Sequence, residues 1–343
     1  MRQNIFLMPF LVSFLISTLL LAVLILLRGK KKNGDGRIGE RHLHKQGISR
    51  FGGAAIIASF VISTIIDINL VIEKPLVGVL LAMGLILLFG LLDDLKQLSW
   101  KIQLVFQIAI VLLVFAFGVR LQFVSNPFGG IFLLQGEWRA FAAVAISIVW
   151  VVFLMNAMNW VDGIDGASGG ITLIGGLSIF FLSLRPEVNQ PPIGILAMIL
   201  TGAVLAFLLF NFHPAKIMAG TSGSMFMGFV LAILSIFAGA KMATTLLVLA
   251  VPIIDAVWVI WERFRAGDSI FSADKRHLHF RLLELGWSQK SICGLYWLIT
   301  ALVSFIALNT NAMGKLWSFS LVAISILVFL FIIRNKVQNK NVE

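Results

Sequence analysis

The sequence predicts an all-α protein that crosses a membrane many times and forms one domain, residues 1–343. Its 343 residues are 59% hydrophobic and only 13% charged, whereas a soluble chain of this length needs far more polar surface. Apolar runs of about twenty residues recur along the whole chain, and such a run is long enough to cross a bilayer as a helix. Helices satisfy their own backbone hydrogen bonds in lipid, which open sheets cannot do.

Eleven apolar runs are candidate membrane-spanning helices, and polar segments separate them. They cover residues 5–27, 50–68, 75–92, 102–118, 140–158, 167–184, 192–212, 222–239, 242–262, 291–310 and 316–333. The first run has no small-residue cleavage site, so we interpret it as a retained span and not as a signal peptide. The segment between the fourth and fifth runs carries Asn-Pro and Gly-Gly turn signals that fit a short hairpin.

Basic residues are shared unequally between the two sides that these spans define. One side holds 20 of the 27 Lys and Arg residues, and basic loops face the cytoplasm. The cytoplasmic segments are therefore 28–50, 93–101, 159–166, 213–221, 263–290 and 334–343. This arrangement places the N-terminus on the outer, periplasmic side of the membrane and the C-terminus in the cytoplasm. The net charge of +11 then reflects topology, and no nucleic-acid partner is expected. Cys293 is the one cysteine, so no internal disulfide is possible.

The stretch from Asn156 to Gly166 is too polar for a simple connection between two spans. Asn156, Asn159 and Asp162 recur every three residues, so they share roughly one face at the end of a helix. Asp165 repeats the spacing, and neighbouring glycines let the backbone turn. Carboxylate and amide oxygens suit a magnesium-like ion and the phosphate that it carries. The alternative interpretation is a polar turn.

Asp93 and Asp94 end the third apolar run. Adjacent carboxylates at a hydrocarbon boundary are costly unless they are paired or solvated. On a helix they point about 100° apart, so one can bind metal or accept a proton while the other takes a basic partner. The alternative, a pair that caps the helix C-terminus, is electrostatically unfavourable.

Two basic segments are suited to phosphate groups at the cytoplasmic surface. Lys45 and Arg50 precede a Gly-Gly pair beside the second span. Arg276, His277 and His279 lie in the longest loop and form a candidate polyphosphate grip. A zinc site would need more ligands at suitable spacing.

The segment from Gly220 to Ser224 opens the eighth apolar run. Free backbone amides at such a helix start can bind an anion. A start rich in small residues and capped by Ser or Thr is an equally good interpretation.

Together and in this order, these clusters resemble the polyprenyl-phosphate N-acetylhexosamine-1-phosphate transferases, glycosyltransferase family 4. That family includes phospho-N-acetylmuramoyl-pentapeptide translocase and enzymes that start O-antigen, enterobacterial common antigen and teichoic acid synthesis. The string Asn156–Gly166 meets the family's Asn-x-x-Asn-x-x-Asp-Gly-x-Asp-Gly pattern in full, which is the most specific match. The Asp-Asp pair falls on Asp93 and Asp94, and the His-x-His element on His277 and His279.

The resemblance implies transfer of a sugar-1-phosphate from a UDP-N-acetylhexosamine such as UDP-GlcNAc to undecaprenyl phosphate. UMP would leave, and the lipid-linked sugar would start cell-wall or lipopolysaccharide synthesis at the cytoplasmic face of the bilayer. The implied catalytic residues are Asp93, Asp94, Asp162 and Asp165. The implied substrate-binding residues are Lys45, Arg50, Asn156, Asn159, Arg276, His277 and His279. Asp165, Asp162 and Thr221 would hold magnesium, with manganese as the alternative ion. The identity of the sugar and a homodimeric state stay open.

The chain departs from the family pattern at Thr221, where members typically carry an aspartate, and at Gln103, where a basic residue is common. A hydroxyl binds a divalent ion more weakly than a carboxylate does, so we expect a higher magnesium requirement. A catalytically weakened homologue is therefore one alternative function. A transporter is another, although transporters bind cargo near the middle of the membrane, and these polar clusters lie on one face. Asp255, in the ninth run, is a partial exception.

Overall fold

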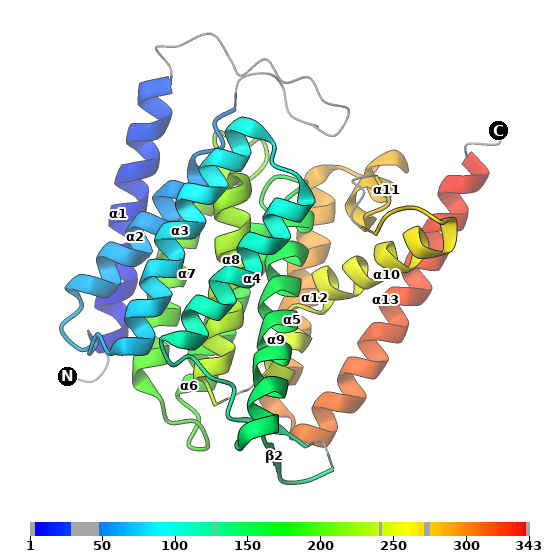
Figure 1. Cartoon of the computed structure of the whole chain (residues 1–343). Helices are drawn as coiled ribbons and strands as arrows, with labels where there is room; N and C mark the ends of the chain where they lie inside the picture. Colours follow the sequence, from blue (N-terminus) through cyan, green and yellow to red (C-terminus); the bar gives the residue numbers. More distant parts are fainter. Residues whose placement is uncertain (1–3, 29–47, 127, 240–241, 271–274, 341–343) are drawn as a thin grey trace.

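The chain folds as a bundle of helices, as Figure 1 shows. This computed structural model describes all residues except 1–3, 29–47, 127, 240–241, 271–274 and 341–343. Its helices are α1 (Asn4–Arg28), α2 (Gly52–Ile66), α3 (Lys74–Lys96), α4 (Trp100–Ala116), α5 (Glu137–Val161), α6 (Ala167–Ser183), α7 (Pro191–Asn211), α8 (Gly220–Phe237), α9 (Met242–Val248), α10 (Ala250–Ala266), α11 (Leu278–Glu284), α12 (Gln289–Asn309) and α13 (Ala312–Lys340). The predicted all-α membrane fold is confirmed.

The helices differ in how well they match the thickness of a bilayer. Within the described residues, seven are long and apolar enough to cross a membrane, namely α1, α3, α5, α7, α8, α12 and α13. The apolar helices α2, α4 and α6 are shorter, and α9 and α10 pass the same test together but are bent by 78°. With α9 and α10 taken as one unit, these helices coincide with the eleven predicted runs. The number that crosses the bilayer, and the orientation, stay predictions.

Two smaller elements lie in the connections between the long helices. Strands β1 (Phe123–Ser125) and β2 (Ile131–Leu133) pair antiparallel, with Val124 opposite Phe132. They form the hairpin that the turn signals predicted between the fourth and fifth runs. Helix α11 lies in the last long loop and was not predicted, because seven residues are too few to show a helical apolar period.

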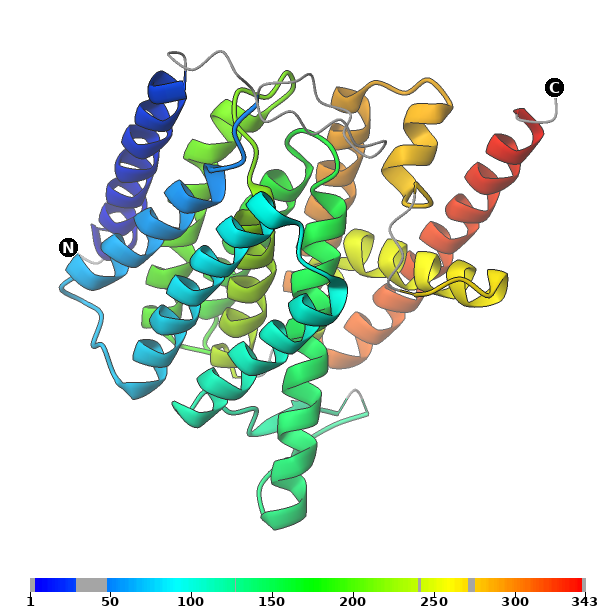
Figure 2. The ribbon, with the colours of Figure 1, turned by 45° about the horizontal axis from the view of Figure 1, so that its top comes forward.

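Among the seven long apolar helices, α8 and α7 are the most buried. In their apolar 18-residue stretches, 83% and 78% of the residues are buried. Helix α8 packs against α3 and α5, and α7 packs against α1 and α6. By contrast, α1 and α13 are each only 17% enclosed and lie at opposite edges of the bundle in Figure 2. Their exposed apolar side chains, such as Leu15 and Leu321, present the surface that lipid would cover.

Glycines let the backbones of α8 and its neighbours approach closely. A Cβ added at Gly228 would collide with the backbone of Leu154 on α5, and one at Gly53 on α2 would collide with Gly223. Small residues serve this purpose in membrane helix packing. The start of α8 is thereby held against the start of α2 and beside the end of α3.

Candidate active site at the α3, α5 and α8 helix ends

Asp93 and Asp94 lie in the last turn of α3. Gln97 stops the helix by adopting a left-handed conformation with φ of 52°, and its amide donates to the Asp93 carbonyl at 2.7 Å. Both aspartates are buried, with 7% and 8% of their surface exposed. The pair is thus enclosed by protein at the point where the chain leaves the helix.

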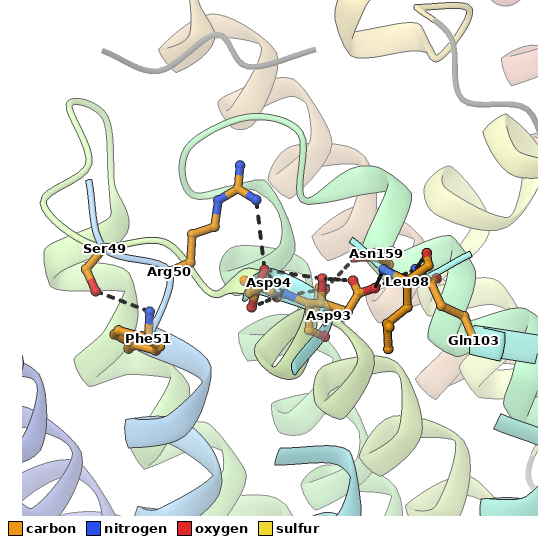
Figure 3. Close-up of polar contacts among 11 residues, drawn as sticks. Ser49, Arg50, Phe51, Asp93, Asp94, Leu98, Gln103 and Asn159 are labelled. Atoms are coloured by element: carbon orange, nitrogen blue, oxygen red, sulfur yellow. Dashed lines mark hydrogen bonds and ion pairs between the residues drawn. The ribbon is translucent and has the colours of Figure 1, made fainter. Parts of the chain in front are cut away.

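Three donors hold the Asp93 carboxylate. One oxygen accepts hydrogen bonds from the amide of Leu98 at 2.9 Å and from Gln103 Nε2 at 3.0 Å, as Figure 3 shows. The other oxygen accepts from Thr221 Oγ1 at 2.8 Å. Asp93 is therefore fixed from two directions, by the α3–α4 turn and by the first turn of α8.

Asp94 contacts the same threonine, Thr221, and a basic side chain, Arg50. The Thr221 amide donates to its carboxylate at 3.0 Å, and Arg50 Nη1 lies 3.9 Å from Oδ1 (Figure 3). Carboxylates are favoured at a helix N-terminus, where backbone amides point outward. The anion-binding turn predicted at Gly220 is thus present, and it receives the protein's own Asp94. The alternative of a Ser or Thr cap is not observed, since α8 has no side-chain cap.

A backbone pairing brings Arg50 to this point. The Gly52 amide donates to the Met218 carbonyl at 2.9 Å, and the following amide makes the equivalent bond to residue 219. Gly220 has a φ of +67°, and a Cβ there would collide with the Asp94 carboxylate and with the Arg50 backbone. A glycine is needed at this position for both conformation and space.

The two asparagines at the end of α5 are tied to different helices. Asn156 Nδ2 donates to Gln107 Oε1 on α4 at 2.7 Å. Asn159 Oδ1 accepts from Ser224 Oγ on α8 at 2.7 Å. Because Ser224 lies one turn after Thr221, the end of α5 and the Asp93–Asp94 pair meet at the start of α8.

Asp162 and Asp165 lie in the turn between α5 and α6. The hydroxyl of Ser168 donates to Asp162 Oδ1. Asp165 is 2% exposed, and its Oδ2 lies 2.7 Å from His213 Nδ1 and accepts from the Ala215 amide at 3.0 Å. The turn is therefore anchored to the segment that follows α7.

Two of these anchoring residues were not singled out from the sequence. Besides His213, Asn211 holds the turn, because its Oδ1 accepts from the Gly166 amide at 2.9 Å. Asn211 is the last residue of α7, and His213 opens the polar segment that precedes Gly220. Their position at the end of a predicted span was the available signal.

The two histidines of the His-x-His element have different surroundings. His277 Nδ1 lies 2.9 Å from Asp255 Oδ2, and Asp255 also accepts from the Leu278 amide at 2.8 Å. The ring of His279 is fully buried, and Gly163 in the α5–α6 turn leaves the space that its Nε2 occupies. The pKa of His279 is lowered to about 3, mainly by burial and to a smaller extent by the nearby His277. The ring is therefore neutral.

The remaining predicted residues are placed less completely. Lys45 lies outside the described residues. Arg276 forms an ion pair with Asp268 on the surface. The roles assigned to these residues and to the two histidines stay predictions. The structure presents His279 as a buried neutral ring and not as a cation that faces a ligand.

The carboxylates and hydroxyls of this region have the right chemistry for a hard divalent cation. Among the described residues, no group of three or more His, Cys, Asp or Glu side chains is arranged to hold a metal. The Thr221 hydroxyl contacts Asp93 and Asp94. The predicted ligand set of Asp165, Asp162 and Thr221 therefore stays a prediction.

Comparison with known proteins identifies related chains over most of this length. Residues 76–239 match the model of the family described as glycosyl transferase family 4. The chain is 33% identical over 301 residues, 79% of this chain and 74% of the relative, to the decaprenyl-phosphate N-acetylglucosaminephosphotransferase of Mycobacterium tuberculosis. It is 28% identical over 299 residues, 85% of this chain and 81% of the relative, to a Bacillus subtilis protein named probable undecaprenyl-phosphate N-acetylglucosaminyl 1-phosphate transferase. It is also 28% identical over 321 residues, 87% and 96%, to the phospho-N-acetylmuramoyl-pentapeptide-transferase of Staphylococcus carnosus.

Proposed function

Since the chain belongs to glycosyl transferase family 4, we propose that it transfers N-acetylhexosamine-1-phosphate from a UDP-sugar to undecaprenyl phosphate and releases UMP. The three relatives named above are transferases, and two of their names specify a polyprenyl phosphate together with N-acetylglucosamine. The site would face the cytoplasm of a bacterial inner membrane, and the product would start synthesis of a cell-envelope polysaccharide.

The observation that carries this proposal is the meeting of three helix ends at Thr221. Asp93 and Asp94 from α3 both contact this residue, and Ser224 on the next turn binds Asn159 from α5. Asp162 follows Asn159 by three residues, so the second carboxylate pair begins within one helical turn of this junction. Residues from distant parts of the sequence that resembled a phosphoryl-transfer site are thus assembled at one end of the bundle.

The reaction joins two anions, so positioning and charge neutralisation are its main demands. An oxygen of the lipid phosphate attacks the sugar-linked phosphorus, a new P–O bond forms, and the P–O bond to UMP breaks. Arg50 beside Asp94 is placed to receive one of the phosphates. Asn159 and Asn156 would hydrogen-bond the nucleotide or hold neighbouring groups in place.

The two α3 aspartates would have different tasks. Asp93 already accepts from two side chains and one amide, so it would position Thr221 and the end of α3. Asp94 lies between the amide of Thr221 and Arg50, and it would orient the attacking lipid phosphate and accept its proton.

Asp162 and Asp165 are the residues that would hold magnesium, or manganese, near the pyrophosphate. When bound, such an ion would neutralise charge on the pyrophosphate and on the leaving UMP. His213 and the Ala215 amide keep one oxygen of Asp165 in a fixed direction, as is common for carboxylates that bind metal.

A turnover assay tests the proposal. Purified protein is incubated with undecaprenyl phosphate, magnesium and a panel of UDP-sugars, and UMP and lipid-linked sugar are measured. We expect both products with one UDP-N-acetylhexosamine, and neither without the lipid. Binding of UDP-sugar without turnover at any magnesium or manganese concentration would instead identify a weakened homologue. The neutral Thr221 in the site would then be the structural reason for the lost activity.

A further inference from the structure

A cavity with several polar side chains in its lining lies at the opposite end of the bundle from the site described above. It has a volume of about 410 Å³, which is within the range that small ligands occupy. The end of α6, the start of α9 and the α12–α13 turn form its walls. Its polar lining comes from Arg185, Glu187, Thr244, Asn309, Asn311 and Lys315.

The lengths of two helices set its distance from the active site. Helix α6 begins beside Asp165 and has 17 residues, so at 1.5 Å per residue its far end lies about 25 Å away. Helix α12 begins at Gln289, whose Oε1 accepts from the Asp165 amide, and it runs for 21 residues. The α12–α13 turn accordingly lies at the lower end of the bundle in Figure 1.

Arg185 lines this cavity and is held in place by the end of α12. Its Nη2 donates to the Leu308 carbonyl and lies 3.4 Å from Asn309 Oδ1. These contacts fix the guanidinium in the cavity wall, where its side chain stays partly exposed. A guanidinium fixed in this way suits the oxygens of a phosphate.

Lys315 supplies a second cation from the first turn of α13. Its Nζ donates to Thr244 Oγ1 at 2.8 Å, so the ammonium is directed towards the same lining. Glu187 contributes one negative charge, which leaves the lining with a formal charge of +1. The formal charge of the lining therefore favours an anion over a cation.

We propose that this cavity binds a phosphate group on the face of the membrane opposite the active site. Both α12 and α13 are candidate spans, so the turn between them lies at a membrane surface. Trp317 and Leu316 beside Lys315 are exposed, as is Phe305 on α12. Lipid chains can cover these apolar side chains while an anionic headgroup enters the cavity. Basic pockets between membrane helices bind headgroups in this manner.

Native mass spectrometry of the detergent-purified protein tests the proposal with phosphatidylglycerol as the probe. We expect the double variant Arg185→Gln/Lys315→Gln to retain about tenfold less phosphatidylglycerol than the unaltered protein, because two charge-assisted contacts are lost. The matched control is Arg120→Gln/Arg139→Gln. It removes two exposed cations near the same end of the bundle that stack on Phe115 and Trp138 outside the cavity.

A second variant keeps the cations and fills the space. Ala243 is an exposed residue of the lining, so Ala243→Trp should block the ligand without removing any hydrogen bond. Inorganic phosphate is added in a competing arm. Its displacement of the lipid shows that phosphate itself is recognised, and binding of phosphate without lipid, lost in both cavity variants, identifies the free ion as the ligand. Equal retention of phosphatidylglycerol by all variants, with no phosphate binding that depends on the cavity residues, would overturn the proposal.

Discussion

The two carboxylate pairs of the site are held in different ways. Asp93 and Asp94 are adjacent on one helix, and both contact a residue more than a hundred positions away, Thr221. Asp162 and Asp165 are three residues apart in a turn, where a nearby hydroxyl holds Asp162 and His213 holds Asp165. The first pair therefore depends on how α3 and α8 pack, whereas the second depends on how the α5–α6 turn meets the segment after α7. Under the proposed function, the first pair would be a rigid binding point for the lipid phosphate and the second a separately adjustable metal site.

The comparison requires that both pairs face the same side of the membrane. Single cysteines at Ser99, beside the first pair, and at Gln122, in the opposite loop, test this by labelling intact cells with an impermeant thiol reagent. Both positions are exposed, and the native Cys293 is buried. From the distribution of basic residues we expect labelling at Gln122 and none at Ser99. Permeabilised cells, in which both should react, are the control, and the reverse pattern would overturn the assigned orientation.

Neutralising one carboxylate in each pair should have the largest effect on turnover. Asp94→Asn and Asp165→Asn each remove a charge that serves the phosphates or the metal, so we expect each to lower kcat at least about a hundredfold. Thermal stability of the purified variants is measured alongside to show that they fold. Near-normal activity in both variants would remove the catalytic roles proposed here, and loss in only one would show which pair is essential.

A smaller loss is expected when only a hydrogen-bond partner of the second pair, and not a carboxylate, is changed. His213→Ala removes the partner of Asp165 Oδ2 at 2.7 Å. A hydrogen bond to a charged group contributes about 1.5–3 kcal/mol, which corresponds to a loss of about tenfold or more in metal affinity. His213→Asn, which keeps a donor near the Nδ1 position, should recover part of it. The measurement is a magnesium titration of activity, and equal behaviour of the two variants would argue against a positioning role for His213.

The apolar runs were sufficient to predict the helices that are candidate spans, but not how α9 joins α10. The run 242–262 is interrupted by a 78° bend between Val248 and Ala250. Pro252 in the first turn of α10 was the available signal, since proline lacks the amide that would continue a helix. The sequence-based assignment gave more weight to the continuous apolar character and treated the run as one span.

The site residues were predictable as types, whereas their partners were not. Spacing and side-chain chemistry pointed to both aspartate pairs. The contact between Thr221 and Asp93 depends on the packing of helices that are distant in sequence, and no local pattern encodes it. For the same reason, the sequence could not show that His279 would be buried against Gly163 while His277 pairs with Asp255.

The last prediction concerns two positions at which this chain departs from the family pattern, Thr221 and Gln103. Both side chains donate to Asp93, at 2.8 Å and 3.0 Å. If Thr221 stands for a lost metal ligand, Thr221→Asp should lower the magnesium concentration for half-maximal activity. The structure favours the opposite result, because the new carboxylate would face Asp93 and Asp94, and like charges at this distance disfavour ionisation.

We therefore expect Thr221→Asp alone to raise the magnesium requirement by a few-fold, roughly the effect of one unfavourable charge contact in a partly solvated site. Adding Gln103→Lys should reverse the change, since an ammonium beside Asp93 offsets the added charge. Gln103→Lys alone is the control, and it should leave the requirement nearly unchanged. A lowered requirement in Thr221→Asp without the lysine would show instead that Thr221 occupies a metal-ligand position. The first pair would then belong to the metal site, and the separation between a rigid phosphate-binding pair and an adjustable metal-binding pair would not hold.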